Sequence, residues 1–264
     1  MENINKNDIV LGLVPRGLVP MGLAPKILNF IDQHPFVSSL DIATFFSLDI
    51  RKVRSIVSKL QKENFLDFIT KPVFFINSNV RYFYTTKKGH LIVGSGRSGS
   101  KDRYIKADKD IINLYLDHNV ESNKFFIRLK KYSIDNNLNF EDWVSDLNLI
   151  FKFKYNNRSY TLKPDGFCIL GKDNIFLELD MATESSFRIF EKIDSYSAFY
   201  LSYEYLKYFK KNPFVIFLTP NKYREKFLKD KVSYFMATKK YKEELNFFKF
   251  INFKDFHQDP SIVL

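Results

Sequence analysis

Apolar residues recur at helical spacing within residues 50–64, which predicts a helix with one buried face. Val53, Ile56, Val57 and Leu60 follow the i, i+3, i+4, i+7 pattern of an amphipathic helix. Polar and basic residues occupy the remaining positions of the same helix. They are Arg51, Lys52, Arg54, Ser55, Ser58, Lys59 and Lys62. Two shorter apolar patterns predict helices over residues 26–33 and 40–46, so three helices are expected in succession.

Strand-like segments follow these helices. Residues 65–76 and 81–86 are rich in β-branched and aromatic residues, and Asn77-Ser78-Asn79 between them predicts a turn. Three helices followed by a hairpin resemble a winged helix-turn-helix, in which the third helix enters the major groove of DNA. The resemblance implies that DNA is bound by residues of the third helix and of the hairpin. On the helix they are Arg51, Lys52, Ser55, Lys59 and Lys62, and on the hairpin Arg81. The alternative is a small helical domain with a solvated basic face.

The second half of the chain alternates between helical and strand-like patterns. Helices are expected over residues 108–132, 186–210 and 223–241, and strands over 147–155, 159–170, 174–180, 214–218 and 247–253. This order predicts an α/β domain with a mixed central sheet, and an α+β chain overall. Residues 94–104 contain a Gly- and Ser-rich linker. The predicted organisation is a lead-in at 1–24, a winged helix at 25–93, this linker, and the α/β domain at 105–264.

Charge adds a preferred type of partner. The chain of 264 residues has a net charge of +11 and an isoelectric point near 9.4. Residues 1–105 hold 15 Lys and Arg against eight Asp and Glu, so the positive charge concentrates near the predicted winged helix. Such an excess favours a polyanion such as double-stranded DNA. The single cysteine, Cys168, is typical of a reducing cytoplasm, and no apolar run is long enough to predict a membrane helix.

Carboxylates cluster at the ends of two predicted strands. Asp165 follows Lys163-Pro164, and Glu178 and Asp180 close the next strand. Carboxylates that meet at one sheet edge repel each other, and Mg²⁺ or Mn²⁺ is the usual relief. A hard divalent cation on a basic protein is typical of phosphate chemistry. This pattern therefore predicts a metal-dependent site that acts on nucleic acid.

The order of helix, three strands, helix and strand resembles the PD-(D/E)xK nuclease core. The resemblance implies that Asp165 and Glu178 hold the metal, and that a lysine two residues after the Glu assists catalysis. Asp180 stands at that lysine's position, so Lys192 on the next helix is the expected substitute, with Lys163 as another candidate. Glu121 on the first long helix is the expected third metal ligand.

A structural reading of these carboxylates stays open. Pro-Asp is also a common turn, and Asp180 is also a natural cap for the helix that follows. The nuclease-like fold without competent chemistry, and an unrelated α/β domain, are the two alternatives to an active endonuclease that nicks DNA. His118 and the tyrosines around Tyr196 fit structural positions better than catalytic or base-stacking ones.

Several motifs in a fixed order are similar to those of the replication-relaxation family of plasmid and mobile-element proteins. The motifs are Leu116-Asp117-His118-Asn119 with Glu121-Ser122-Asn123, Trp143 with Asp146, Lys163-Pro164-Asp165-Gly166, Glu178-Leu179-Asp180 with Thr183-Glu184, and Lys192 with Tyr196. The resemblance implies a role in DNA replication, at plasmid initiation or origin relaxation, with double-stranded DNA of a plasmid origin or operator as the partner. The alternatives are a non-catalytic transcription or copy-number regulator, whose C-terminal domain mediates dimerisation or partner binding, and a restriction-type endonuclease. A homodimer is one assembly open to the protein.

Overall fold

The computed structural model describes residues 22–73, 78–94, 109–145, 149–239 and 244–264. The chain divides between Lys131 and Tyr132 into two compact units, which we call the N-terminal and C-terminal units. No helix among the described residues is long and apolar enough to cross a membrane. The expected linker at 94–104 lies almost entirely outside the described residues.

Three helices open the N-terminal unit: α1 (Leu23–Gln33), α2 (Ser39–Phe46) and α3 (Ile50–Lys62). A capping box begins α2, because the Ser38 hydroxyl accepts the Asp41 amide at 3.2 Å and the Asp41 carboxylate accepts the Ser38 amide at 2.8 Å. The Asp49 carboxylate begins α3 by accepting the Arg51 amide at 2.8 Å. The predicted helices are therefore present, each with a defined start.

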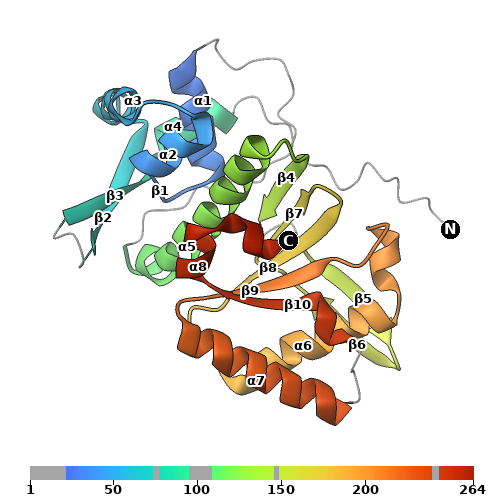
Figure 1. Ribbon diagram of the computed structural model, residues 1–264. Coiled ribbons are helices and arrows are strands. Elements are labelled where there is room, and N and C mark those ends of the chain that lie inside the picture. Colours follow the sequence, from blue (N-terminus) through green and yellow to red (C-terminus); the bar gives the residue numbers. More distant parts are fainter. Residues whose placement is uncertain (1–21, 74–77, 95–108, 146–148, 240–243) are drawn as a thin grey trace. The chain divides into compact units, whose positions relative to one another are not determined.

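A small antiparallel sheet completes the winged-helix topology. Strands β1 (Val37–Ser38), β2 (Leu66–Val73) and β3 (Ser78–Thr85) lie in the order β1-β3-β2 (Figure 1). The turn predicted at residues 77–79 is wrong in part, because Ser78 and Asn79 already belong to β3 and pair with β2. A fourth helix, α4 (Lys87–Gly94), was not expected, since its Gly89 and β-branched residues are poor helix formers.

The helix expected over 108–132 is α5 (Lys109–Asp135), and its first part belongs to the N-terminal unit. Leu116 and Val120 are buried in one cluster with Phe36 and two tyrosines of β3. The Asn123 amide also donates to the Pro35 carbonyl at 2.7 Å. The compact unit thus extends past the expected linker to Lys131, because α5 buries apolar side chains against β3.

The C-terminal unit is built on a mixed sheet of five strands in the order β10-β9-β8-β7-β4 (Figure 1). The strands are β4 (Phe140–Ser145), β7 (Gly166–Leu170), β8 (Asp173–Leu179), β9 (Phe214–Thr219) and β10 (Phe248–Asn252). Pairing is parallel from β8 to β10 and antiparallel from β4 to β8, which confirms the expected α+β class with a mixed sheet. Gly166 allows close packing here, because a Cβ at this position would overlap the Trp143 ring and displace it.

The three consecutive strands predicted over residues 147–180 do not form one meander, so this prediction is wrong. The segment 159–170 is two strands, β6 (Arg158–Leu162) and β7, because Pro164 cannot donate to a ladder and the chain changes sheets there. β6 pairs with β5 (Phe151–Tyr155) in a separate hairpin, and the unpredicted β4 takes the place beside β7. The polar residues of β4 weakened its strand pattern.

Helices α6 (Ser186–Leu201) and α7 (Lys222–Lys239) pack side by side over one face of the sheet (Figure 1). Aromatic side chains dominate this core, including Phe176 of β8 and Phe199 of α6, both fully buried. The helix predicted over 186–210 ends early, because Tyr203 adopts a left-handed backbone and a 3-10 turn (Glu204–Lys207) follows. The chain closes with α8 (Phe253–Gln258) and a further 3-10 turn (Pro260–Val263), neither of which was predicted.

Candidate functional site

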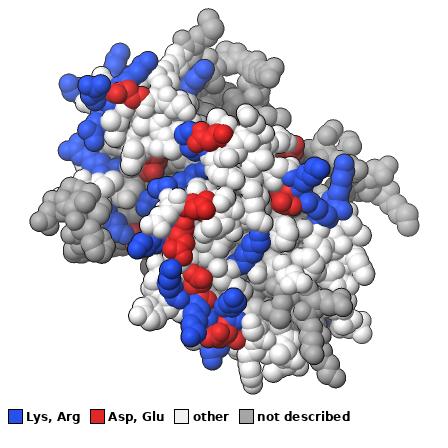
Figure 2. Space-filling model, in the orientation of Figure 1, with Lys and Arg blue, Asp and Glu red and all other residues white. Residues whose placement is uncertain are grey.

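The exposed face of α3 in the N-terminal unit is strongly basic. Val53, Val57 and Leu60 are buried on the inner face of the helix. The outer face is exposed, and it carries Arg51, Lys52, Arg54, Ser55, Lys59 and Lys62. Figure 2 shows blue side chains gathered at the place where Figure 1 has α3. The five predicted residues of this helix therefore share one accessible surface, together with Arg54, which belongs in the same set.

Two acidic residues flank this face and engage it only weakly. The Arg51 guanidinium donates to Asp49 at 3.3 Å, which lowers the pKa of that carboxyl. Lys59 lies 4.0 Å from Glu63, with 76% of its side chain exposed. Ion pairs as exposed as these contribute little and exchange readily for another anion. The basic face is thus available to a ligand.

The hairpin adds one cation on a fixed support. Arg81 of β3 is exposed, and its guanidinium lies 4.7 Å from the centroid of the Phe68 ring on β2. Such a cation–π contact restrains the side chain without neutralising its charge. Lys71 of β2 instead pairs with Asp117 of α5. Arg81, as predicted from the sequence, is therefore the exposed cation of this hairpin that the structure holds in place.

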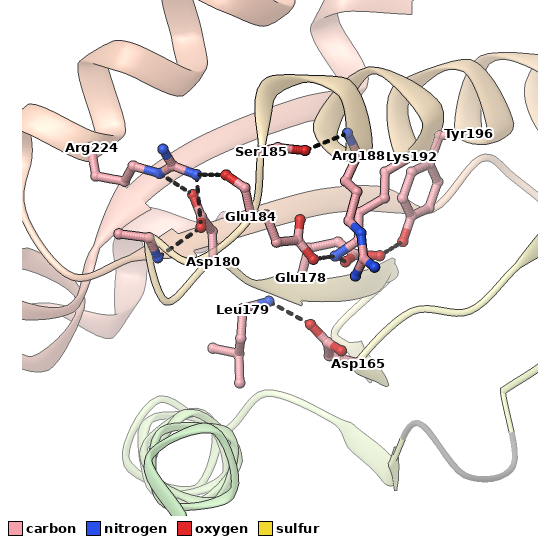
Figure 3. A network of polar contacts seen from close by, with 11 residues as sticks. Asp165, Glu178, Leu179, Asp180, Glu184, Ser185, Arg188, Lys192, Tyr196 and Arg224 are labelled. Carbon is pink, nitrogen blue, oxygen red and sulfur yellow. Dashed lines mark hydrogen bonds and ion pairs between the residues drawn. The ribbon is translucent and has the colours of Figure 1, made fainter. Parts of the chain in front are cut away.

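A second polar cluster lies in the C-terminal unit, where two neighbouring strands bring Asp165 and Glu178 side by side. The Asp165 amide donates to the Leu177 carbonyl at 2.9 Å, and the Leu179 amide donates to Asp165 Oδ2 at 2.7 Å. This pairing places the Asp165 carboxylate next to the Glu178 side chain (Figure 3). Glu178 shares the α6-facing side of β8 with Phe176, because alternate residues point to the same face.

Helix α6 supplies the groups that surround Glu178. Lys192 and Tyr196 are one turn apart, so both project toward the sheet (Figure 3). Lys192 Nζ is 2.8 Å from Glu178 Oε2 and 2.8 Å from Glu184 Oε1. The Tyr196 hydroxyl donates to Glu178 Oε1 at 2.6 Å. We call Asp165, Glu178, Glu184, Lys192 and Tyr196 the carboxylate network.

Burial determines the electrostatics of the network. The pKa of Glu178 is raised to about 7, because burial and the neighbouring Asp165 carboxylate outweigh the opposite effects of Lys192 and the Tyr196 hydroxyl. Burial lowers the pKa of Lys192, but Glu178, Asp165 and Glu184 together raise it well above its usual range. Lys192 therefore stays protonated and is the resident cation of the network.

Asp180, predicted to act with Glu178, binds Arg224 of α7 and is not part of the carboxylate network. Arg224 of α7 binds it in a bidentate manner, with Nε 2.6 Å from Oδ2 and Nη2 3.1 Å from Oδ1. The Ala182 amide donates to Oδ1 at 2.9 Å, and Arg224 Nη2 also reaches the Glu184 carbonyl at 3.0 Å (Figure 3). Asp180 thus joins the end of β8 to α7. The structure brings together Asp165, Glu178 and Lys192 of the predicted catalytic set, but not Asp180.

An open hollow of about 400 Å³ borders the carboxylate network. Exposed Lys163 and Arg188 lie on its lining together with Lys192, beside Glu178, Glu184 and Glu191. Cations and carboxylates are thus balanced around the hollow. Lys163 lies at this opening rather than in the network itself.

The donor groups do not fit Mg²⁺ or Mn²⁺ in this arrangement. Both oxygens of Glu178 are engaged, one by the Tyr196 hydroxyl and one by the Lys192 ammonium, and one oxygen of Asp165 holds the Leu179 amide. Glu121, the expected third ligand, belongs to the N-terminal unit and pairs with Lys124 at 2.7 Å. No group of three His, Cys, Asp or Glu side chains suited to a metal occurs in the part of the chain that the structure describes. The metal expectation stays a prediction without a matching donor set.

Three members of these contacts were not assigned from the sequence. Glu184 and Arg224 interact with residues of other elements, and the Asp180–Arg224 contact spans 44 residues. The sequence predicts Tyr196 as a core residue, and it is fully buried, but its hydroxyl also donates a hydrogen bond to Glu178. Two signals in the sequence point to it: its place with Lys192 in the motif shared with the replication-relaxation family, and its position four residues after Lys192, which aligns the two side chains on one helix face.

Comparison with known proteins gives one extended match. No curated protein matches the chain. A solved structure of FabT from Streptococcus pneumoniae in complex with DNA aligns over 35% of this chain and 71% of that one, with 17% identity and a TM-score of 0.24. The family model described as replication-relaxation matches residues 28–215, which include α3, Asp165, Glu178 and Lys192. The match covers well over half of the sequence, and the chain therefore belongs to the replication-relaxation family.

Proposed function

We propose that the protein binds double-stranded DNA through the outer face of α3 and acts in the replication of a plasmid or mobile element. The observation that carries the proposal is the exposed basic face of α3, opposite its buried apolar stripe. Family membership supports the replication role. The proposed site on the DNA is a plasmid origin or operator.

The proposal gives each basic element a role by analogy with winged helices. A helix of this diameter enters the major groove, where Arg51, Lys52 and Ser55 in the first half of α3 face base edges. Lys59 and Lys62 follow on later turns and meet phosphates. Arg81 on the hairpin contacts the flanking backbone. Most of the affinity then arises from counterion release, so binding weakens steeply with salt.

The test is equilibrium binding of the full chain to labelled duplexes that cover the origin of its own replicon. Arg51→Ala weakens binding to the specific site by about 1–3 kcal/mol and relaxes its sequence preference. Lys59→Ala weakens binding to all duplexes alike and lowers the salt slope by about one. Lys154→Ala, an exposed lysine of β5, is the matched control. Equal effects from Lys59→Ala and Lys154→Ala would remove α3 from the proposed interface.

Sedimentation of the DNA complex addresses the assembly. A homodimer binds two half-sites about one helical turn apart, and a monomer binds one. Dimer-sized complexes on a two-half-site duplex, which dissociate to monomer-sized ones when one half-site is scrambled, are the result expected of a homodimeric regulator. Monomer-sized complexes on both duplexes would contradict it.

Metal-dependent nicking by the C-terminal unit is the second candidate. The observation that favours it is the convergence of Asp165, Glu178 and Lys192 beside an open hollow. The engaged oxygens of Glu178 oppose it, and favour a non-catalytic role. Supercoiled plasmid carrying the origin is incubated with protein and Mg²⁺ or Mn²⁺. Nicking by the wild type that is lost in Glu178→Ala supports the activity, and nicking that survives this substitution excludes the network as its site.

A further inference from the structure

Helix α7 has a buried apolar stripe that accounts for its packing. Leu228, Val232 and Met236 recur every four residues, and each is fully buried against α6 and the sheet. Amphipathic helices normally present polar residues on the opposite side. Any apolar stripe on that outer side is therefore unrelated to the core and requires another explanation.

The outer side of α7 carries three exposed aromatic rings. Tyr223 is 90% exposed, Tyr234 67% and Phe227 36%. At about 100° per residue, these three positions align in one stripe directly opposite the buried one. The stripe extends over roughly 16 Å of the helix axis, at 1.5 Å per residue. Large rings so exposed, and so aligned, indicate a binding surface.

Lysines flank the aromatic stripe. Lys226 and Lys231 are exposed and have no acidic partner among the described residues, and Lys231 Nζ lies 5.7 Å from the Phe227 centroid. Three other cations of α7 have contacts of their own, since Lys222 is 3.4 Å from Asp255, Arg224 holds Asp180, and Lys239 lies over the Phe235 ring. Asp230 is the one acidic residue between the lysines. The stripe is thus aromatic and positively charged.

We propose that this outer face of α7, formed by Tyr223, Phe227 and Tyr234 with Lys226 and Lys231, binds single-stranded nucleic acid. Unpaired bases stack on exposed rings, and phosphates pair with neighbouring lysines, which is the combination that recurs in single-strand binding surfaces. A duplex does not satisfy the stripe, because its base faces are already stacked inside the helix. The surface is distinct from α3 and the duplex interface proposed there.

The test is binding of the full chain to fluorescein-labelled oligothymidylate, measured by anisotropy at fixed salt. Tyr223→Ala and Tyr234→Ala each weaken binding at least about fivefold, since one stacked base contributes about 1 kcal/mol or more. Tyr223→Phe retains most of the affinity, because the ring remains. Tyr203→Ala, which removes a ring that is also 67% exposed but lies outside α7, leaves binding unchanged.

Two further readouts separate this surface from the duplex interface and from a protein-binding surface. The α7 variants bind duplex DNA like the wild type, whereas Lys59→Ala on α3 retains oligothymidylate binding. Wild-type affinity for oligothymidylate in the Tyr223→Ala/Tyr234→Ala double variant overturns the proposal. So does a loss confined to Lys226→Ala and Lys231→Ala, which would indicate charge without stacking. If the Tyr223→Ala/Tyr234→Ala double variant sediments differently from the wild type but binds oligothymidylate with the same affinity, the stripe serves protein association instead.

Discussion

Replacing Lys192 by Met removes the resident cation of the carboxylate network while it preserves much of the side chain's bulk. Glu178 is 2% exposed at its side chain and loses the ammonium at 2.8 Å, and Glu184 loses the same partner. Removing one member of a buried ion pair costs about 3–5 kcal/mol. Because the Lys192 side chain is 28% exposed, we expect the lower end, about 3 kcal/mol.

The assay is thermal unfolding of the full chain at pH 8, in which the transition of the C-terminal unit is followed. For a unit of this size, a loss of 3 kcal/mol corresponds to a decrease of roughly 10 °C in Tm. The decrease is smaller at pH 5, because the Glu178 carboxyl, whose pKa is raised to about 7, is then largely protonated and needs less compensation. Adding Glu178→Gln to Lys192→Met restores part of the loss at pH 8.

An exposed ion pair provides the control. Lys211 lies 2.6 Å from Asp173 with 49% of its side chain exposed, so Lys211→Met costs about 1 kcal/mol or less. If Lys192→Met destabilises the protein no more than Lys211→Met, or if Glu178→Gln restores nothing, Lys192 does not compensate a buried carboxylate and the network is misassigned.

Three other outcomes follow from the same contacts. Glu178 has a raised pKa in the folded chain and therefore binds its proton more tightly than in the unfolded chain. The stability that this proton contributes, on the order of 3 kcal/mol, is present below about pH 4.5 and disappears as the pH rises through about 7. In urea titrations at a series of pH values, Glu178→Gln lacks this pH-dependent part of the free energy of unfolding. Arg224→Ala leaves buried Asp180 uncompensated and lowers the free energy of unfolding by about 3 kcal/mol, whereas Arg224→Lys retains part of it. Gly166→Ala displaces the Trp143 ring, which changes the emission of the chain's single tryptophan and destabilises the C-terminal unit by about 1–3 kcal/mol; unchanged emission and stability would contradict the close contact.

Local patterns predicted the elements that have strong periodicity. The apolar spacing of α3 and the continuous apolar run of β9 are both found where expected. β4 was missed because its charged residues interrupt the alternation. The end of α6 was missed because the chain turns at Tyr203, which adopts a left-handed backbone, and no glycine or proline marks that position in the sequence.

The candidate site shows the same division. Asp165 and Glu178 were predicted to meet because neighbouring strands bring their ends together, and they do lie side by side. The partner of Asp180 lies 44 residues away on α7, and no local pattern relates the two. Whether a buried carboxylate is balanced by a metal or by a lysine depends on such distant contacts, so the sequence alone left it open.

Site-directed cross-linking from α3 tests the proposed duplex interface most directly. Cys168, the only cysteine in the sequence, is fully buried, and burial raises the pKa of its thiol, so an introduced cysteine is labelled selectively. Ser55→Cys and, as a control, Ser159→Cys on β6 are labelled with a photoactivatable group and irradiated with origin duplex; both parent serines are exposed. We predict adducts to bases of a defined site from position 55 and few from position 159. Equal cross-linking from both positions, or none from position 55 while the duplex is bound, would contradict DNA recognition by α3.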